Sequence, residues 1–132
     1  MKKITLLLVL TWLLFSCSNN DPIFELKILP VKEAKTPDFF EFGSIDTISV
    51  KYELPNNCYQ FWSIYYEYDT NKRIVAINAI HDLESICTQA TIEQEIKIPI
   101  QVLQEENYIF KFYKGKDANG ENIFEEIEVP VN

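Results

Sequence analysis

The sequence predicts an all-β protein of one domain, folded as an antiparallel sandwich of seven strands. Three observations support this prediction. Apolar side chains alternate with period two in seven segments, no segment keeps the period of an amphipathic helix, and turn residues bound the segments at even spacing. The length of 132 residues, of which 47% are apolar and 24% charged, is typical of one globular domain.

Residues 1–16 have the pattern of a cleaved secretory signal helix. Two lysines precede an apolar run, 4–15, which is too short to span about 30 Å of hydrocarbon. The run ends in Leu14-Phe15-Ser16-Cys17, which resembles the lipobox of bacterial lipoproteins. The resemblance implies that Cys17 becomes the acylated N-terminus of a membrane-anchored protein, and Ser18 after it resembles an outer-membrane sorting signal. The alternative is a plain secretory signal with an incidental cysteine.

Residues 17–22 then form the acylated cysteine and a short polar tether, and residues 23–132 form the sandwich. The full chain has 12 basic and 20 acidic residues, a net charge of −8. Loss of Lys2 and Lys3 with the signal leaves 10 basic residues and a net charge of −10. The basic residues are scattered, which argues against a nucleic-acid partner because such proteins need a cationic surface.

The expected strands follow one another at short intervals. They cover residues 23–29, 47–54, 59–68, 73–80, 92–100, 108–112 and 123–131. The first places Phe24, Leu26 and Ile28 on one face. The second places alternate apolar residues toward the core, namely Ile48, Val50, Tyr52 and Leu54.

Tyr108 stands at the start of a strand, two residues before an inward aromatic residue. This resembles the tyrosine corner of immunoglobulin-like domains, whose hydroxyl bonds back to the corner's backbone. Trp62, in the third expected strand, matches the place of the buried tryptophan of those domains. The resemblance implies an immunoglobulin or fibronectin type III-like sandwich.

Cys58 and Cys87 are the cysteines that remain after acylation of Cys17. In an oxidising compartment such a pair usually forms a disulfide. Free thiols are the alternative. A metal site is disfavoured, because two isolated cysteines and one histidine do not supply four ligands. The pair does not match the usual inter-sheet disulfide of immunoglobulin domains.

Several stretches of the mature chain resemble small lipoproteins of flavobacteria and related Bacteroidetes. These stretches are residues 42–48, 54–58, 87–88, 108–116 and 117–124. The resemblance implies lipid anchoring and a sandwich, and it supplies no activity.

The strand over residues 59–68 is the candidate binding surface. Strict alternation places Tyr59, Phe61 and Tyr65 on one face, and the opposite face takes Trp62, Ile64, Tyr66 and Tyr68. One face of a sandwich strand meets solvent, so part of this set should be exposed and able to stack on sugars or on a partner protein. The alternative is that the rings cover the edges of the sandwich.

Two other patterns resemble reactive or metal sites. His81-Asp82 is the only His-carboxylate pair, but adjacent strand residues point apart and no nucleophile motif accompanies them. The segment 117–121 places Asp117, Asn119 and Glu121 like ligands of a calcium loop, whereas its Asn-Gly pair favours a hairpin.

The sequence therefore predicts a lipid-anchored binding or accessory protein of a bacterial envelope, in the outer membrane, with no catalysis and no cofactor. A glycan or an envelope protein is the expected partner. The alternatives are a small envelope hydrolase that uses His81, and a purely structural or inhibitor-like lipoprotein.

Overall fold

The structure, a computed structural model, describes Asp21 and residues 23–132. The expected signal segment, Cys17 and most of the tether lie outside these residues. The described residues contain no helix that is long and apolar enough to cross a membrane. They form β-strands, which confirms the all-β prediction. The strands are β1 (Phe24–Leu29), β2 (Val31–Lys35), β3 (Ile45–Leu54), β4 (Tyr59–Asp69), β5 (Lys72–Asp82), β6 (Ile92–Gln101), β7 (Tyr108–Lys116) and β8 (Asn122–Val129).

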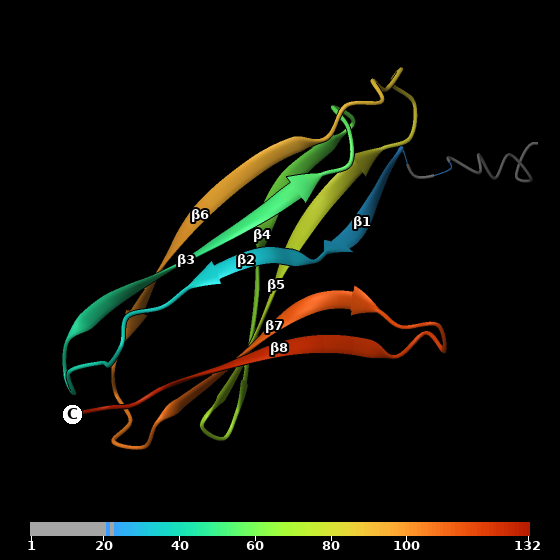
Figure 1. Cartoon of the computed structure of the whole chain (residues 1–132). Helices are drawn as coiled ribbons and strands as arrows, with labels where there is room; N and C mark the ends of the chain where they lie inside the picture. Colours follow the sequence, from blue (N-terminus) through green and yellow to red (C-terminus); the bar gives the residue numbers. More distant parts are fainter. Residues whose placement is uncertain (1–20, 22) are drawn as a thin grey trace, which may run out of the picture.

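The strands form the two layers of a β-sandwich (Figure 1). One layer contains β2, β3 and β6 in that order, so β6 is an edge strand. The other contains β1, β4, β5, β7 and β8. In this layer β4 pairs with β5 along nearly its whole length, and β1 and β7 share the remaining side of β5. Strand β4 is therefore an edge strand too.

The pairing of β5 with β7 is parallel, over the first residues of β5. Every other named pair is antiparallel, as predicted. The parallel pair arises because β6, which lies between β5 and β7 in sequence, belongs to the other layer. The chain reverses once on leaving β5 and once on returning, so β7 runs in the direction of β5 (Figure 1).

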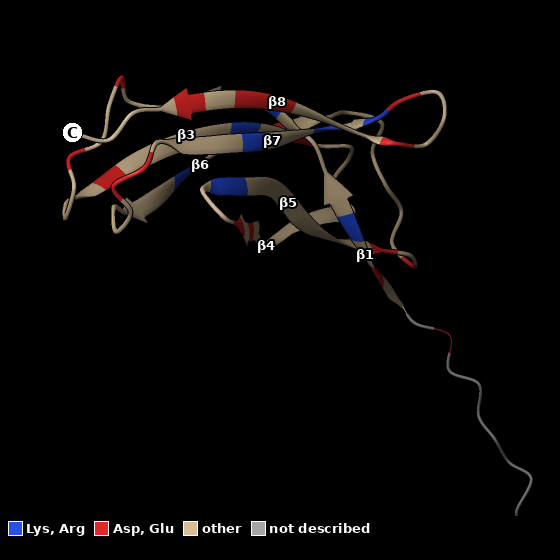
Figure 2. Ribbon diagram, turned by 90° about the horizontal axis from the view of Figure 1, so that it is seen from below, with Lys and Arg blue, Asp and Glu red and all other residues tan. Residues whose placement is uncertain are grey.

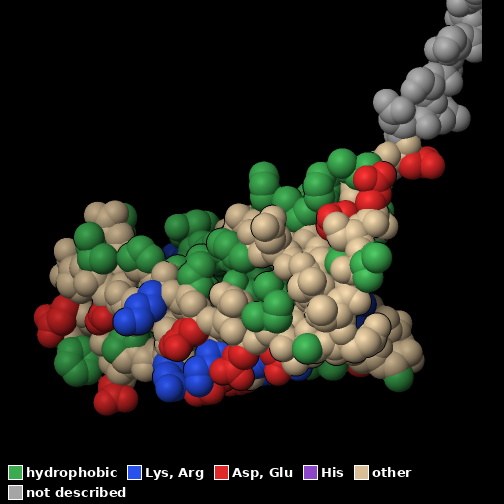
Figure 3. Space-filling view, turned by 90° about the horizontal axis from the view of Figure 1, so that it is seen from above, with side chains coloured by type: hydrophobic (Ala, Val, Ile, Leu, Met, Phe, Trp, Pro, Cys, Tyr) green, Lys and Arg blue, Asp and Glu red, His purple; other side chains and the backbone are tan. Residues whose placement is uncertain are grey.

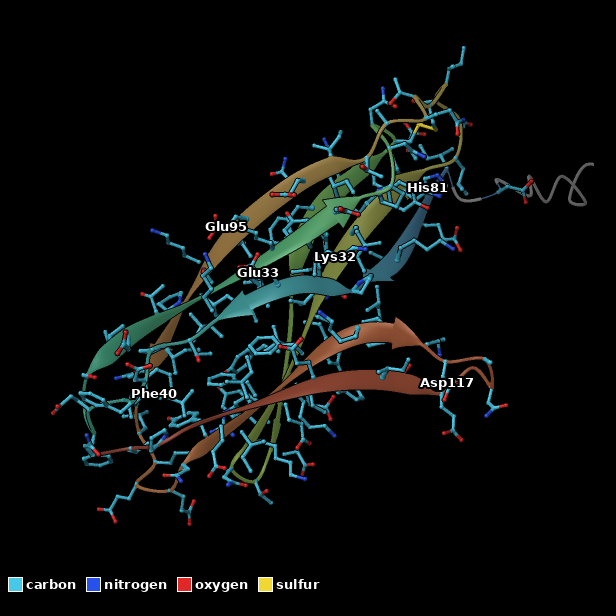
Figure 4. The ribbon with its side chains drawn as sticks, in the orientation of Figure 1. Lys32, Glu33, Phe40, His81, Glu95 and Asp117 are labelled. Carbon is cyan, nitrogen blue, oxygen red and sulfur yellow. A yellow bond between two sulfur atoms is a disulfide. The ribbon has the colours of Figure 1, made fainter. Side chains whose placement is uncertain are left out.

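Strand β2 raises the strand number from the predicted seven to eight. The first expected strand ends at Pro30, and β2 begins directly after it but in the other layer. The pattern of β2 was not visible in the sequence because it buries only Val31 fully. Its charged side chains form ion pairs with β3 instead. Glu33, labelled in Figure 4, lies 3.3 Å from Nζ of Lys51 through its carboxylate oxygen.

The core lies between the layers and is built on inward residues of β3, β5, β6 and β7. The four predicted inward residues of β3 are buried, from Ile48 to Leu54. Phe40 lies outside the strands but is completely buried (Figure 4). Its ring meets the rings of Tyr108 and Phe110 edge-on, with centroids 5.2 and 6.1 Å away. Backbone hydrogen bonds join Phe40 to the C-terminal segment and hold it there.

The surface divides into apolar and charged regions. Phe24, Leu26 and Ile28 do share one face of β1, but this face is solvent-exposed. In the view of Figure 3, hydrophobic side chains gather in a hollow of the surface and near the start of the described chain. Acidic residues follow the edge strand β8 (Figure 2), where repeated charge opposes pairing with another chain.

Candidate functional site

The aromatic strand β4 contains a β-bulge at Trp62. Phe61 pairs with Ala79 and Ser63 pairs with Asn78, so Trp62 is an extra residue with no partner on β5. A bulge shifts the phase of the side-chain alternation by one residue. The division of the strand into two aromatic faces was therefore wrong. Five apolar residues share the inner face instead, namely Tyr59, Phe61, Ile64, Tyr66 and Tyr68.

The match of Trp62 to the buried tryptophan of immunoglobulin-like domains was also wrong, although its place in the candidate exposed surface agrees with the structure. Its side chain is 62% exposed, because β4 is an edge strand and the bulge removes this residue from the regular pleat. In immunoglobulin domains the tryptophan is buried against the inter-sheet disulfide, whereas Trp62 lies on β4, which has a single neighbour in its sheet among the described strands.

The six aromatic candidates lie in separate places. Tyr59 stacks on His81 at one end of the strand, with centroids 4.2 Å apart. Tyr65 faces outward, and its hydroxyl donates to Glu67. Tyr66 and Tyr68 meet edge-on at the other end, with centroids 5.3 Å apart. Tyr66 and Tyr68 line a cleft of the edge strands, and Tyr65 lines a separate and smaller pocket of about 200 Å³.

The cleft opens between the edge strands of the two layers and has a volume of about 450 Å³. This is a size at which pockets hold small ligands. Strands β4 and β6 and the loop after β6 form its walls. The apolar part of the walls comes from Ile64, Tyr66, Tyr68, Ile98, Ile100 and Leu103.

Arg73 also lines this cleft and is 6% exposed. It is the second residue of β5, and it faces inward because it pairs with Tyr68 and shares its side with Val75. Its Nη1 donates to the carbonyl oxygens of Thr70 and Lys72 at 2.9 and 2.8 Å. Its Nη2 donates to Oε1 of Gln104 at 2.5 Å.

Aromatic rings cover the Arg73 guanidinium. Its central carbon lies 4.4 Å from the ring centroid of Tyr68 and 5.1 Å from that of Tyr108. Within residues 23–132 no carboxylate oxygen lies within 4.0 Å of it. Buried charges are normally paired with an opposite charge. Here neutral oxygens and ring faces are the described partners of the cation.

Tyr66 stays neutral beside this cation at ordinary pH. Burial raises the pKa of Tyr66 to about 12, and the nearby Arg73 charge opposes this rise. Its hydroxyl can therefore donate or accept a hydrogen bond in the cleft across the whole physiological range.

Residues 48–129 match the family model of the ORF11 beta-sandwich domain. The match begins within β3 and ends with the last residue of β8, and it covers more than half of the chain. The chain belongs to the ORF11 beta-sandwich domain family. No curated protein and no solved structure is similar enough to the chain to count as a match.

The predicted disulfide is present in this ORF11-type sandwich. Cys58 and Cys87 are bonded, and their Cα atoms are 5.4 Å apart. The bond joins the loop before β4 to the loop after β5, at the end of the sandwich where His81 lies (Figure 4).

His81 and Asp82 act separately at this end. The ring of His81 stacks on Tyr59, and its Nδ1 is buried without a hydrogen-bond partner among the described residues. Asp82 accepts hydrogen bonds from the Ser85 hydroxyl and from the backbone N–H groups of Glu84 and Ser85. The hydrogen bond from the Ser85 hydroxyl is the main cause that lowers the pKa of Asp82, and the hydrogen bond from the N–H of Glu84 is the next. The pair is thus not arranged as an acid that orients a catalytic histidine.

The segment of the calcium candidates forms the β7–β8 hairpin loop. Oδ1 of Asp117 accepts hydrogen bonds from the backbone N–H groups of Asn119 and Glu121 at 2.8 and 3.0 Å. Gly120 takes the positive φ of 78° that the turn requires. The hairpin prediction is confirmed. No group of three metal-ligating side chains occurs in residues 23–132.

Sequence reasoning missed Arg73 as a site residue. The available signal was its position two residues before Val75 and four before Ile77, on the inward side of an expected strand. Gln104 had no such signal, because it lies in a loop that only the fold brings to Arg73.

Proposed function

We propose that this ORF11-family protein is a lipid-anchored binding protein of a bacterial cell envelope, with no catalysis of its own. The segment that ends in Leu14-Phe15-Ser16-Cys17 supports the anchor, with Cys17 as the acylated residue and the outer membrane as its location. The sandwich then stands at the membrane surface on a tether of about five residues.

The observation that carries the binding role is the cleft between β4 and β6. It combines exposed aromatic surface with one buried cation. Tyr68 lines the cleft and is 72% exposed, although its position in β4 is on the inner face of the strand. Exposed rings beside a concave surface are typical of sites that stack on sugars or hold a partner's side chain. A glycan or an envelope protein is the proposed partner.

The anchor is tested with Cys17→Ser. The wild-type protein should take up labelled palmitate and pellet with membranes, and the variant should do neither. Continued labelling of the variant would contradict the anchor, whatever the outcome for binding.

The binding role is tested on a glycan array and by capture from envelope extracts. The protein used is the mature chain 17–132 with Cys17→Ser, which includes every described strand. We expect Tyr68→Ala to reduce binding at least tenfold. Trp62→Ala is the matched control, because Trp62 is a comparably exposed ring on the same strand but does not line the cleft. Equal binding by both variants and the parent would place the ligand elsewhere. A hydrolase activity lost in His81→Ala would replace the proposal.

A further inference from the structure

We infer that the cleft between β4 and β6 binds a ligand through a carboxylate, that Arg73 is the residue that receives it, and that the ligand is an acidic sugar of the uronic acid class. This inference rests on the proposed binding function and names the ligand's chemistry.

The buried charge of Arg73 favours an anionic ligand. A guanidinium remains protonated at any physiological pH, so Arg73 cannot escape the cost of burial by losing its proton. Its described hydrogen bonds go to two carbonyl oxygens and one amide oxygen, all of them neutral. Removing a charge from water without an opposite charge is costly. A carboxylate that enters the cleft would supply that charge.

The geometry of the guanidinium donors favours a carboxylate among anions. Arginine has five N–H groups in one plane. Three of them are engaged by Thr70, Lys72 and Gln104. The other N–H groups have no carboxylate partner among the described residues, the neutral Tyr66 hydroxyl interacts with the guanidinium, and Arg73 lines the cleft. A carboxylate is the anion that matches a planar pair of guanidinium donors.

The walls of the cleft are suited to a sugar ring. The ring centroid of Tyr68 lies 4.4 Å from the central carbon of the Arg73 guanidinium. The side chain of Tyr68 is nevertheless largely exposed, so part of its ring can contact a ligand. The neutral hydroxyl of Tyr66 lies near the Arg73 guanidinium in the same cleft. A sugar ring offers one apolar face for stacking and hydroxyl groups for such polar neighbours. A uronic acid joins these features to a carboxylate on the same ring.

The background charge of the protein makes this site selective. The chain carries a net charge of −8, and this field opposes the general attraction of anions to its surface. Binding of an anion therefore requires a local cation that is fixed in place, and Arg73 is held by three hydrogen bonds and two rings.

The test compares the binding of glucuronate with that of glucose. The two sugars differ at one carbon, which is a carboxylate in glucuronate and a hydroxymethyl group in glucose. Binding to the mature Cys17→Ser chain is followed by NMR titration of the backbone amides and the arginine Nε–H groups. We expect glucuronate to bind at least tenfold more tightly than glucose, with shifts centred on Arg73 and Tyr68. Equal affinity for the two sugars, or binding of neither, would overturn the inference.

Gln104→Glu provides the decisive variant. The substitution is nearly isosteric and places a carboxylate oxygen where Arg73 Nη2 already donates, while it removes the two hydrogen bonds that Gln104 Nε2 donates to the carbonyl oxygens of Glu106 and Asn107. Glucose affinity therefore reports any displacement of this loop. The new carboxylate pairs with the Arg73 cation and so competes with the carboxylate of the ligand. The affinity for glucuronate should fall at least tenfold, and the affinity for glucose should change little. Gln60→Glu adds the same charge at an exposed position of β4 that does not line the cleft, and it should leave both affinities unchanged. Cooperative unfolding and preserved amide dispersion show that each variant is folded.

The outcomes separate this inference from the proposed function. If a neutral glycan from the array binds, loses affinity in Tyr68→Ala and is unaffected by Gln104→Glu, the binding role stands and the acidic ligand is wrong. Tighter binding of an acidic dipeptide than of glucuronate would overturn the assignment to sugars. That result would keep Arg73 as a carboxylate site, whereas binding of no carboxylate ligand would leave Arg73 only the role of holding the β4–β5 turn.

Discussion

The hydroxyl oxygen of Tyr108 accepts a hydrogen bond from the backbone N–H of Leu103 at 3.2 Å, across the turn that precedes β7. The same oxygen lies 3.5 Å from the carbonyl oxygen of Gln101. This is the tyrosine corner predicted from the sequence, and it is confirmed. The bond also has a consequence for the cleft, because it fixes the loop that contributes Leu103 and Gln104 to the cleft walls.

Removal of this hydroxyl should destabilise the fold by a modest amount. Tyr108 is 2% exposed, and Tyr108→Phe keeps its packing against Phe40 while it leaves a backbone N–H without its partner. We expect a loss of about 1–3 kcal/mol in the free energy of unfolding. Tyr108→Ala also empties a core site and should cost about 3–5 kcal/mol. Equilibrium denaturation measures both, and a Tyr108→Phe variant as stable as the wild type would remove the corner as a source of stability.

Deletion of Trp62 should be tolerated. Trp62 is the extra residue of the bulge, so its removal restores regular alternation and leaves Phe61 and Ile64 on the inner face. We expect a loss of about 1 kcal/mol or less, as for a surface change.

Deletion of Tyr65 is the matched control. It removes one residue where the strand is regular, so apolar residues on one side of the deletion must turn outward. This variant should lose several times more stability than the Trp62 deletion, or fail to fold. Comparable stability of the two deletion variants would mean that the bulge does not set the register.

The disulfide should account for a large part of the stability. It closes a loop with a sequence separation of 29 residues. The loop-entropy relation gives about 3.6 kcal/mol for a loop of this length, which corresponds to a fall in melting temperature on the order of 10 °C when the bond is absent. Calorimetry of the oxidised protein and of the Cys58→Ser/Cys87→Ser variant measures this difference. Native mature protein should show no free thiol at these positions, and a titre of two would contradict the bond.

The stability of the fold should decrease at alkaline pH through Tyr66. The folded pKa of Tyr66 is about 12, above the ordinary value of 10, so below pH 10 the group is neutral in both states. Above pH 10 the unfolded chain ionises first, and stability falls until the folded group also ionises near pH 12. We expect Tyr66→Phe to lose less stability than the wild type between pH 9 and 11, as measured by urea unfolding. Parallel losses in the two proteins would show that Tyr66 does not contribute.

Much of the fold followed from local pattern. The alternation of Ile48, Val50, Tyr52 and Leu54 identified a strand and its inner face, because each strand residue points to the side opposite its neighbours. The disulfide followed from cysteine number, and the corner from the place of Tyr108 before an aromatic strand. Phe40 and β2 were missed because neither has an alternating pattern of its own.

The candidate site depended on features that a local pattern does not record. A bulge inserts one residue without changing composition or turn signals, so the faces of β4 could be assigned only from its pairing with β5. Likewise, the outward position of Phe24, Leu26 and Ile28 depends on the register of β1 with β5.

The sequence by itself determined an all-β domain, most of its strands, its disulfide and its tyrosine corner, because these depend on side-chain period and on residue type. Only the tertiary structure decided that β4 and β6 are edge strands with a cleft between them, and that Gln104 reaches Arg73 from a loop 31 positions later. The physical reason is that burial and electrostatic pairing depend on distances between residues far apart in the chain. Those distances are fixed when the two layers pack.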